Sequence, residues 1–216
     1  MSKQKLQVVG NLSAKERLVH AAMKLFGERG YDGVSVREIA AEADVSIGLI
    51  KHHFGSKEGL RQAVDEFFIS IFESFYGDDD GHIEDLSSRE TLSTLDNWVA
   101  GVAGDWPVFS RYFRRALLEE TPWGAELFKR YYDLVRGSID RLDAQGKIRE
   151  DADRLWLPFL FIFLETGTLL MDSYIEKILG RSGFESDLWK RRYRAYNAMI
   201  ARGVMVQGPK DKDDSA

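Results

Sequence analysis

The segment between residues 35 and 60 contains three helix starts in quick succession, and this spacing constrains the fold more than any other feature. Ser35-Val36-Arg37-Glu38 is a capping box: the serine hydroxyl accepts from the Glu38 amide while the Glu38 carboxylate accepts from the Ser35 amide. Ser46 and Ser56 are the next candidate caps, which leaves each of the two intervening helices about two turns. Helices this short form only when they pack against other elements. The pattern therefore predicts a compact unit of several helices.

A longer helix is expected upstream, between a Ser13 cap and a Gly30 stop, because apolar residues recur there at intervals of three and four. Together the three helices make a helix-turn-helix unit. The side chains expected in its shared core are Ile39, Ala40, Val45 and Ile50. The last short helix, from Ile47 to His53, is then presented outward, where it fits the major groove of DNA.

The rest of the chain predicts helices and no strands, about nine helices in all. The helix capped by Ser56 has an apolar stripe of Leu60, Val64, Phe67, Phe68, Ile71 and Phe75. Further helices are expected at 88–101, 106–119, 122–145, 152–179 and 186–202. The expected divisions are a flexible arm at 1–12, the helix-turn-helix domain at 13–60, a helical domain at 61–205 and a disordered tail at 206–216.

Composition excludes several classes of site. The 216 residues include no cysteine, so thiol catalysis, disulfides and cysteine-ligated zinc are excluded. The four histidines form no Glu-x-x-His pair, and no glycine-rich phosphate loop occurs. We therefore expect neither a metal nor a cofactor. No signal peptide is recognisable, and the apolar run Leu155 to Leu164 is about half the length of a membrane span; we expect a cytoplasmic protein without a membrane partner.

Charge and aromatic residues are unevenly distributed. Residues 1–60 carry a net charge of +2, and the remainder carries −7. Only three of the 26 aromatic residues lie in the first 60 positions. A weakly basic head on an acidic, aromatic-rich body suggests contact with a polyanion by one part and enclosure of an apolar molecule by the other.

The chain resembles the TetR family of bacterial transcriptional regulators from Val36 to Phe54 (VREIAAEADVSIGLIKHHF) and in SKEGL at 56–60. Residues 21–33, AAMKLFGERGYDG, are also similar to that family's first helix and turn. The resemblance covers about residues 13–75. Asp44 stands where the family usually has a glycine, and Lys51 and His52 stand where it often has tyrosine. The lysine replaces a phosphate-donating hydroxyl with a full charge.

The resemblance implies an all-α protein: a three-helix DNA-binding domain followed by a helical bundle that binds a ligand and dimerises. It implies a homodimeric repressor, not an enzyme, released from a palindromic double-stranded DNA operator by a small apolar or amphipathic effector. The expected DNA-binding residues are Ser35, Val36, Arg37, Ser46, Ile47, Gly48, Leu49, Lys51, His52, His53 and Lys57. Among them, Arg37 and Lys57 are expected to reach phosphates.

Aromatic residues at helical spacing are typical of a core or a subunit interface, but the resemblance also implies an effector pocket. The pocket candidates are Trp98, Trp106, Phe109, Phe113, Trp123, Phe128, Tyr132, Phe159, Phe163 and Glu165. Glu165 follows an apolar run, so its carboxylate needs a partner: an ion at the interface, a ligand in the pocket, or solvent. The basic cluster at 190–194 is expected on the outer face of a dimerisation helix.

Two alternatives come from other classes of protein. One is a small helical enzyme that uses His52 or His53 as acid or base, although no nucleophile or metal set accompanies them. The other is a helix-turn-helix unit that serves only protein–protein contact.

Overall fold

The computed structural model describes residues 12–76 and 106–206. Its eight described helices are α1 Ala14–Arg29, α2 Val36–Glu42, α3 Gly48–Phe54, α4 Lys57–Tyr76, α6 Trp106–Leu118, α7 Pro122–Ala144, α8 Leu157–Leu179 and α9 Ser186–Gly203. Ile148 and Met205 form an isolated antiparallel bridge. The all-α prediction is confirmed. The expected helix at 88–101, the Phe75 side chain, the arm to residue 11 and the tail from 207 lie outside the described residues.

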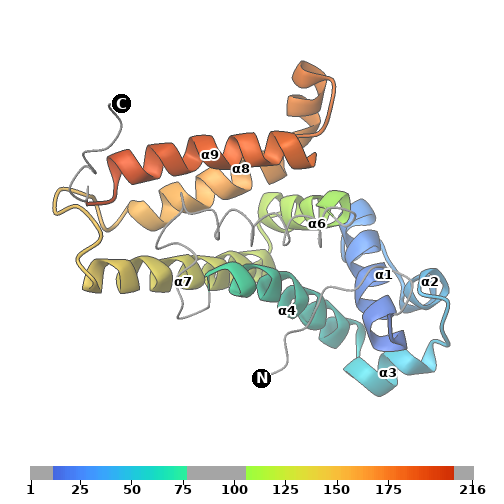
Figure 1. Ribbon diagram of the computed structural model, residues 1–216. Coiled ribbons are helices and arrows are strands. Elements are labelled where there is room, and N and C mark those ends of the chain that lie inside the picture. The colour runs from blue at the N-terminus through green and yellow to red at the C-terminus, as the bar shows by residue number, and fades with distance from the viewer. Residues whose placement is uncertain (1–11, 77–105, 207–216) are drawn as a thin grey trace.

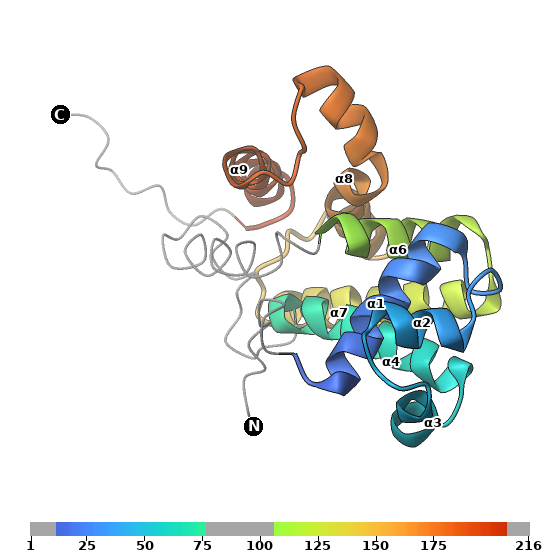
Figure 2. The ribbon, with the colours of Figure 1, turned by 90° about the vertical axis from the view of Figure 1, so that its right-hand side faces the viewer.

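The helices divide into a small head and a larger body (Figure 1). The head consists of α1, α2 and α3, and α4 runs from it into the body alongside α7. α6 packs across α1, so α4 and α6 both join the head to the body. Viewed from the side, α3 lies at the outer end of the head, away from α8 and α9 (Figure 2).

The helix starts follow the sequence closely. Ser13 and Ser35 each form the complete capping box, with Glu16 and Glu38 as the returning carboxylates. The Thr121 hydroxyl accepts from the Gly124 amide at 3.1 Å, with Pro122 in the first turn.

α8 begins five residues later than predicted. Oδ1 of Asp153 accepts from the amides of Leu155 and Trp156 at 2.9 and 3.1 Å, which forms a turn in place of the expected first helical turn. Pro158 then lies in the first turn of the helix, where its missing amide costs nothing. By length and composition α8 could cross a membrane, with 33% of its most apolar window buried; core helices of soluble proteins meet the same criterion.

Aromatic packing between α4 and α6 forms the centre of the core. Phe68 stacks on Phe113 with centroids 4.7 Å apart, and both are fully buried. Leu60, Val64 and Ile71 are buried on the same stripe of α4, as predicted. This stripe fixes α4 against α6, and α4 in turn carries the head.

Candidate nucleic-acid interface

The turn before α3 has the backbone conformation that a helix-turn-helix requires. Asp44 has a φ of 51°, a left-handed conformation that aspartate tolerates better than most residues. The Val45 amide donates to the Ala40 carbonyl at 3.0 Å, which closes the turn against the end of α2. Ile50 and Ile39 are buried in the shared core. These contacts leave the other side of α3 facing outward.

Ser46 does not cap α3, contrary to the prediction. The N-cap position belongs to Ile47, which has helical dihedral angles and forms no side-chain cap hydrogen bond. The amides of Leu49 and Ile50 donate instead to the carbonyls of Ser46 and Ile47, both at 3.1 Å. A tight backbone turn therefore satisfies these amides, and Ser46 stays exposed.

The outer face of α3 is basic. Lys51, His52 and His53 are exposed, and none of them forms an ion pair within the described part of the chain. Arg37 on α2 is likewise exposed and without an ion pair there. Of the other predicted DNA-binding residues, Ser35, Ser46, Ile47 and Gly48 are exposed, and Val36, Leu49 and Lys57 are half-buried.

The acidic residues of α2 are paired on its other side. Glu38 accepts from Arg29 at 2.8 Å, and Glu42 accepts from Lys24 at 2.5 Å. The Ser35 hydroxyl and amide, together with Arg29, lower the pKa of Glu38 to about 2. The acidic residues on the α1 side are thus paired, whereas the basic side chains of Arg37 and Lys51 form no ion pair among the described residues and are available to an anionic partner.

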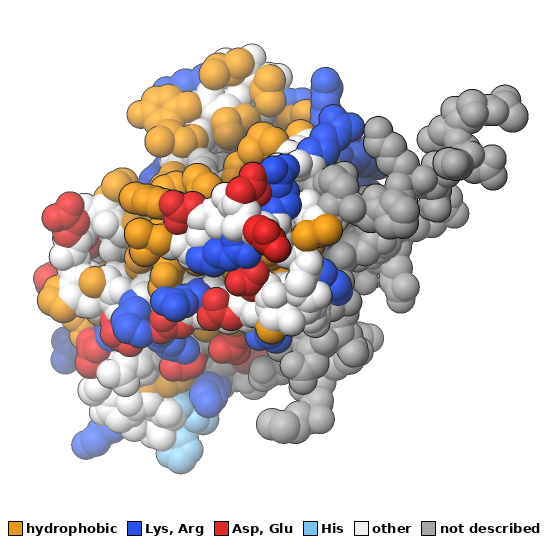
Figure 3. Space-filling model, turned by 90° about the vertical axis from the view of Figure 1, so that its left-hand side faces the viewer, with side chains coloured by type: hydrophobic (Ala, Val, Ile, Leu, Met, Phe, Trp, Pro, Cys, Tyr) orange, Lys and Arg blue, Asp and Glu red, His pale blue; other side chains and the backbone are white. Residues whose placement is uncertain are grey.

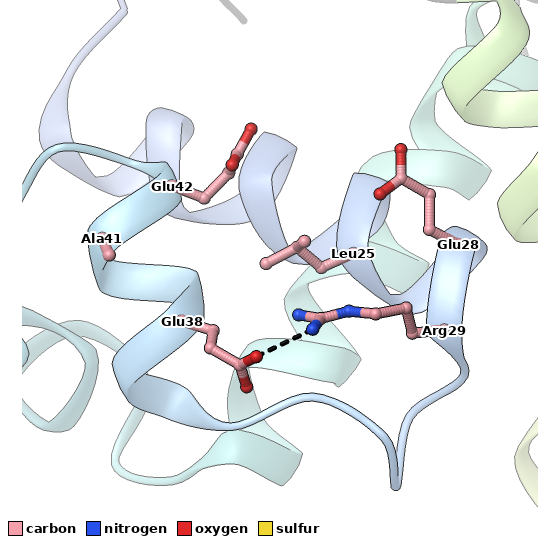
Figure 4. Close-up of a pocket in the computed structure, with 6 residues that line it drawn as sticks. All are labelled: Leu25, Glu28, Arg29, Glu38, Ala41 and Glu42. Carbon is pink, nitrogen blue, oxygen red and sulfur yellow. Dashed lines mark hydrogen bonds and ion pairs between the residues drawn. The ribbon is translucent and has the colours of Figure 1, made fainter.

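A surface hollow of ≈ 540 Å³ lies between α1 and α2 (Figure 4). Its rim carries Glu28, Glu38 and Glu42, with Leu25, Arg29 and Ala41 between them. The Arg29–Glu38 ion pair spans it, and Glu28 pairs with Arg111 at 3.0 Å. Since each carboxylate has a basic partner, the hollow offers no uncompensated charge to a ligand.

Lys57 differs from the other predicted phosphate ligands. Its ammonium donates to the backbone carbonyl of Tyr31 at 2.6 Å. It also lies 4.1 Å from the centroid of the Tyr31 ring, a cation–π contact. This contact could not be predicted from local sequence patterns, because its two partners are 26 residues apart.

The effector-pocket candidates fall into separate clusters. Trp106, Phe109 and Phe113 are buried in the core, and Tyr132 packs on Phe159 at 4.9 Å between α7 and α8. Trp98 lies outside the described residues. The remaining candidates are Trp123, Phe128 and Glu165, which are half-buried, and Phe163, which is exposed.

The prediction that the whole basic cluster at 190–194 lies on the outer face of α9 is wrong for Arg192. Its guanidinium lies over the rings of Phe184 and Trp189, at 5.2 and 5.7 Å, and so does not belong to the outer face. Burial lowers the pKa of Arg192 and raises that of Glu165 on α8, and the opposite charge of each partly counters the shift of the other. The two groups therefore lie near enough to interact electrostatically.

Comparisons with known proteins agree with this geometry. The family model "Bacterial regulatory proteins, tetR family" matches residues 18–64, which span α1 to the start of α4. The HTH-type transcriptional regulatory protein RaaS of Mycobacterium tuberculosis is 53% identical over 57 residues, 26% of each chain. The "Probable HTH-type transcriptional regulator YttP" of Bacillus subtilis is 24% identical over 76% of this chain and 79% of its own.

Solved structures extend the likeness in fold to the body. TylP, a TetR regulator from Streptomyces fradiae, superposes with a TM-score of 0.62 at 19% identity, covering 89% of this chain and 87% of that one. A TetR transcriptional regulator from Chloroflexus aurantiacus gives a TM-score of 0.56 at 19% identity over 90% and 97%. Residues 18–64 therefore carry the helix-turn-helix unit of tetR-family bacterial regulators, and the chain as a whole shares the fold of TetR transcriptional regulators.

Proposed function

We propose that this regulator is a cytoplasmic, homodimeric repressor that binds a palindromic DNA operator and leaves it when a small apolar or amphipathic effector binds in the body. The observation that carries the proposal is the exposed face of α3, whose basic side chains have no ion-pair partner among the described residues. A helix held outward in this way fits the major groove.

The roles of the interface residues follow from their positions. Lys51 and Arg37 contact phosphates, which supplies affinity without sequence preference. The side chains placed at base edges or close to the groove are Ser46, Ile47, Leu49, His52 and His53. Gly48 allows close approach, and Ser35 and Val36 begin the helix that carries Arg37.

Dimerisation is supported by an apolar stripe along α8. Its members recur at intervals of three and four: Leu160, Phe163, Gly167, Met171, Tyr174 and Ile178. Apart from Gly167 they are more than half exposed, and Figure 3 shows hydrophobic side chains crowded over the part of this face that α8 and α9 occupy. Such a stripe is typical of a helix that packs on another helix.

A groove of ≈ 270 Å³ between α8 and α9 continues this surface, with Met199 and Ile200 on its α9 side. We assign it to the second subunit. A twofold dimer would place two α3 helices about 34 Å apart, one turn of DNA.

Effector release requires that the ligand prefer the conformation that does not bind DNA. A hundredfold loss of operator affinity needs a preference of about 2.7 kcal/mol. The aromatic rings of the body suit an apolar or amphipathic molecule better than a strongly charged one.

The test is a gel shift on the DNA that flanks the protein's own gene, with unlabelled nonspecific DNA as competitor. We expect a retarded complex that survives the competitor and disappears with the correct effector. If none of the flanking fragments is bound at low salt, the regulator model is rejected. If nonspecific DNA abolishes the retarded complex completely, a helix-turn-helix unit that serves only protein–protein contact is favoured. Retention of the complex with every apolar effector tried would count against release.

A further inference from the structure

Lys57 bridges the two ends of the helix-turn-helix unit. Its ammonium bonds to Tyr31 in the loop between α1 and α2, and Lys57 itself begins α4. α2 starts after Tyr31, at Val36, and α3 ends before Lys57, at Phe54. One hydrogen bond therefore closes a segment of chain that contains α2, the turn and α3. Closing a segment restricts the conformations of everything within it.

The Tyr31 end of this bridge is itself held in place. The Tyr31 ring packs on Phe26 of α1 with centroids 5.3 Å apart. Glu58 on α4 lies near the Tyr31 hydroxyl: the pKa of the Glu58 carboxyl is lowered chiefly by its hydrogen bonds from Arg61, and Tyr31 adds to this lowering. The Tyr31 carbonyl also accepts from the Val34 amide at 3.4 Å. The carbonyl that receives the ammonium thus belongs to a residue that is packed against α1 and bonded within its own loop.

The Lys57 end is equally constrained. A Cβ on Gly59 would lie 2.1 Å from the carbonyl oxygen of Phe54, so the start of α4 touches the end of α3 at a distance that only glycine permits. The Ser56 hydroxyl caps α4 by accepting from the Gly59 amide at 3.0 Å. Any movement of Lys57 would therefore move the end of α3.

We propose that Lys57 is a positioning residue: it fixes the recognition helix α3 relative to α1 and α4, and it does not give its charge to a DNA phosphate. The inference rests on the proposed DNA binding. Lys57 is half-buried, and its ammonium contacts both the Tyr31 carbonyl and the Tyr31 ring, so extending it outward to a phosphate would weaken these contacts and loosen the segment that DNA binding needs ordered.

The test separates charge from position. Full-length protein is titrated onto a fluorescent random-sequence duplex at several salt concentrations, and binding is followed by anisotropy. Removing a phosphate ligand lowers the slope of log affinity against log salt by about one. The variants are Lys57→Gln, which keeps a neutral donor for the Tyr31 carbonyl, Lys57→Met, which removes the donor, and Lys51→Met as the matched phosphate control.

We expect Lys57→Gln to bind with the wild-type slope and nearly wild-type affinity. Lys57→Met should lose about tenfold in affinity, the scale of one charged hydrogen bond, with the slope unchanged. Lys51→Met should lower the slope by about one. Hydrogen exchange should accelerate in α3 and in residues 31–35 for Lys57→Met alone.

A salt slope lowered by about one in Lys57→Gln would overturn the proposal. This measurement tests the proposal even if Lys57→Met fails to fold. Unchanged exchange in a folded Lys57→Met would overturn it as well. If the wild type binds no duplex at low salt, the proposed function fails instead, and the exchange measurement still reports on the bridge.

Discussion

The hydroxyl of Tyr112 on α6 donates a 2.6 Å hydrogen bond to Oδ1 of Asp65 on α4, and both side chains are buried. Asp65 also pairs with Arg61, whose guanidinium lies 5.2 Å from the Trp123 ring of α7. Arg61 in turn donates to Glu58, which lies in the first turn of α4, at 2.5 Å. A continuous polar chain thus links the body helices to the residues that hold the head.

Replacing Tyr112 by phenylalanine should lower the free energy of unfolding by about 1–3 kcal/mol, because a buried carboxylate loses a donor. Burial raises the pKa of Asp65, which shows that its carboxylate has little solvent to replace the hydrogen bond from Tyr112. Urea denaturation with an unchanged m-value measures it. The control, Tyr132→Phe on the half-buried face of α7, should change stability by about 0.5 kcal/mol or less. Equal losses of unfolding free energy in the two variants would show that the hydrogen bond to Asp65 does not stabilise the fold.

The sequence predicted the head well because its determinants are local. The predicted Ser13 cap, the predicted Ser35–Glu38 capping box and the turn at Asp44 depend on residues within a few positions of one another. Ser46 failed as a cap because two backbone carbonyls satisfy the amides instead, a choice that residue types do not encode.

Contacts between distant segments were not predictable in the same way. The partners Tyr112 and Asp65 are 47 residues apart, and their pairing exists only once α6 crosses α4. A local signal was nonetheless present: Arg61 and Asp65 lie at i and i+4 beside the apolar stripe of α4. Charged residues at such positions are expensive unless paired.

Acid should weaken the start of α2 through Glu38. Its folded-state pKa of about 2 lies below the ordinary value of 4.5, so its stabilising effect is present above 4.5 and is lost as the pH falls towards 2. Glu38→Gln removes this titration but can keep a capping box. The difference in unfolding free energy between wild type and Glu38→Gln should therefore shrink between pH 5 and pH 2.5. A difference that stays constant across this window would contradict the assignment.

Gly167 should matter only in the dimer. A Cβ there meets nothing within 4 Å in the part of the chain that the structure describes, although glycine inside a helix costs about 1 kcal/mol. Gly167→Leu should raise the dimer dissociation constant about tenfold or more by overpacking the α8 stripe, as measured by sedimentation equilibrium. Gly137→Leu on α7, where a Cβ meets only the end of Arg141 at 3.8 Å, is the control and should leave it unchanged. An unaltered dimer in both would place the interface elsewhere.

Gly48 gives the sharpest test of whether α3 enters the groove. Among the described residues, a Cβ at this position would meet only the Ser46 hydroxyl, at 3.7 Å, so the folded head has room for alanine. Gly48→Ala should stabilise the protein by about 0.5 kcal/mol, because alanine favours the helix. If the backbone of α3 approaches the bases, the same methyl group should weaken specific operator binding by about tenfold, since it enters a closely packed contact. Thermal unfolding and gel shift measure the two effects separately, and Gly137→Ala should raise stability without any change in DNA binding. A Gly48→Ala protein that is more stable and binds its operator as tightly as the wild type would show that α3 does not come close to the duplex at this residue.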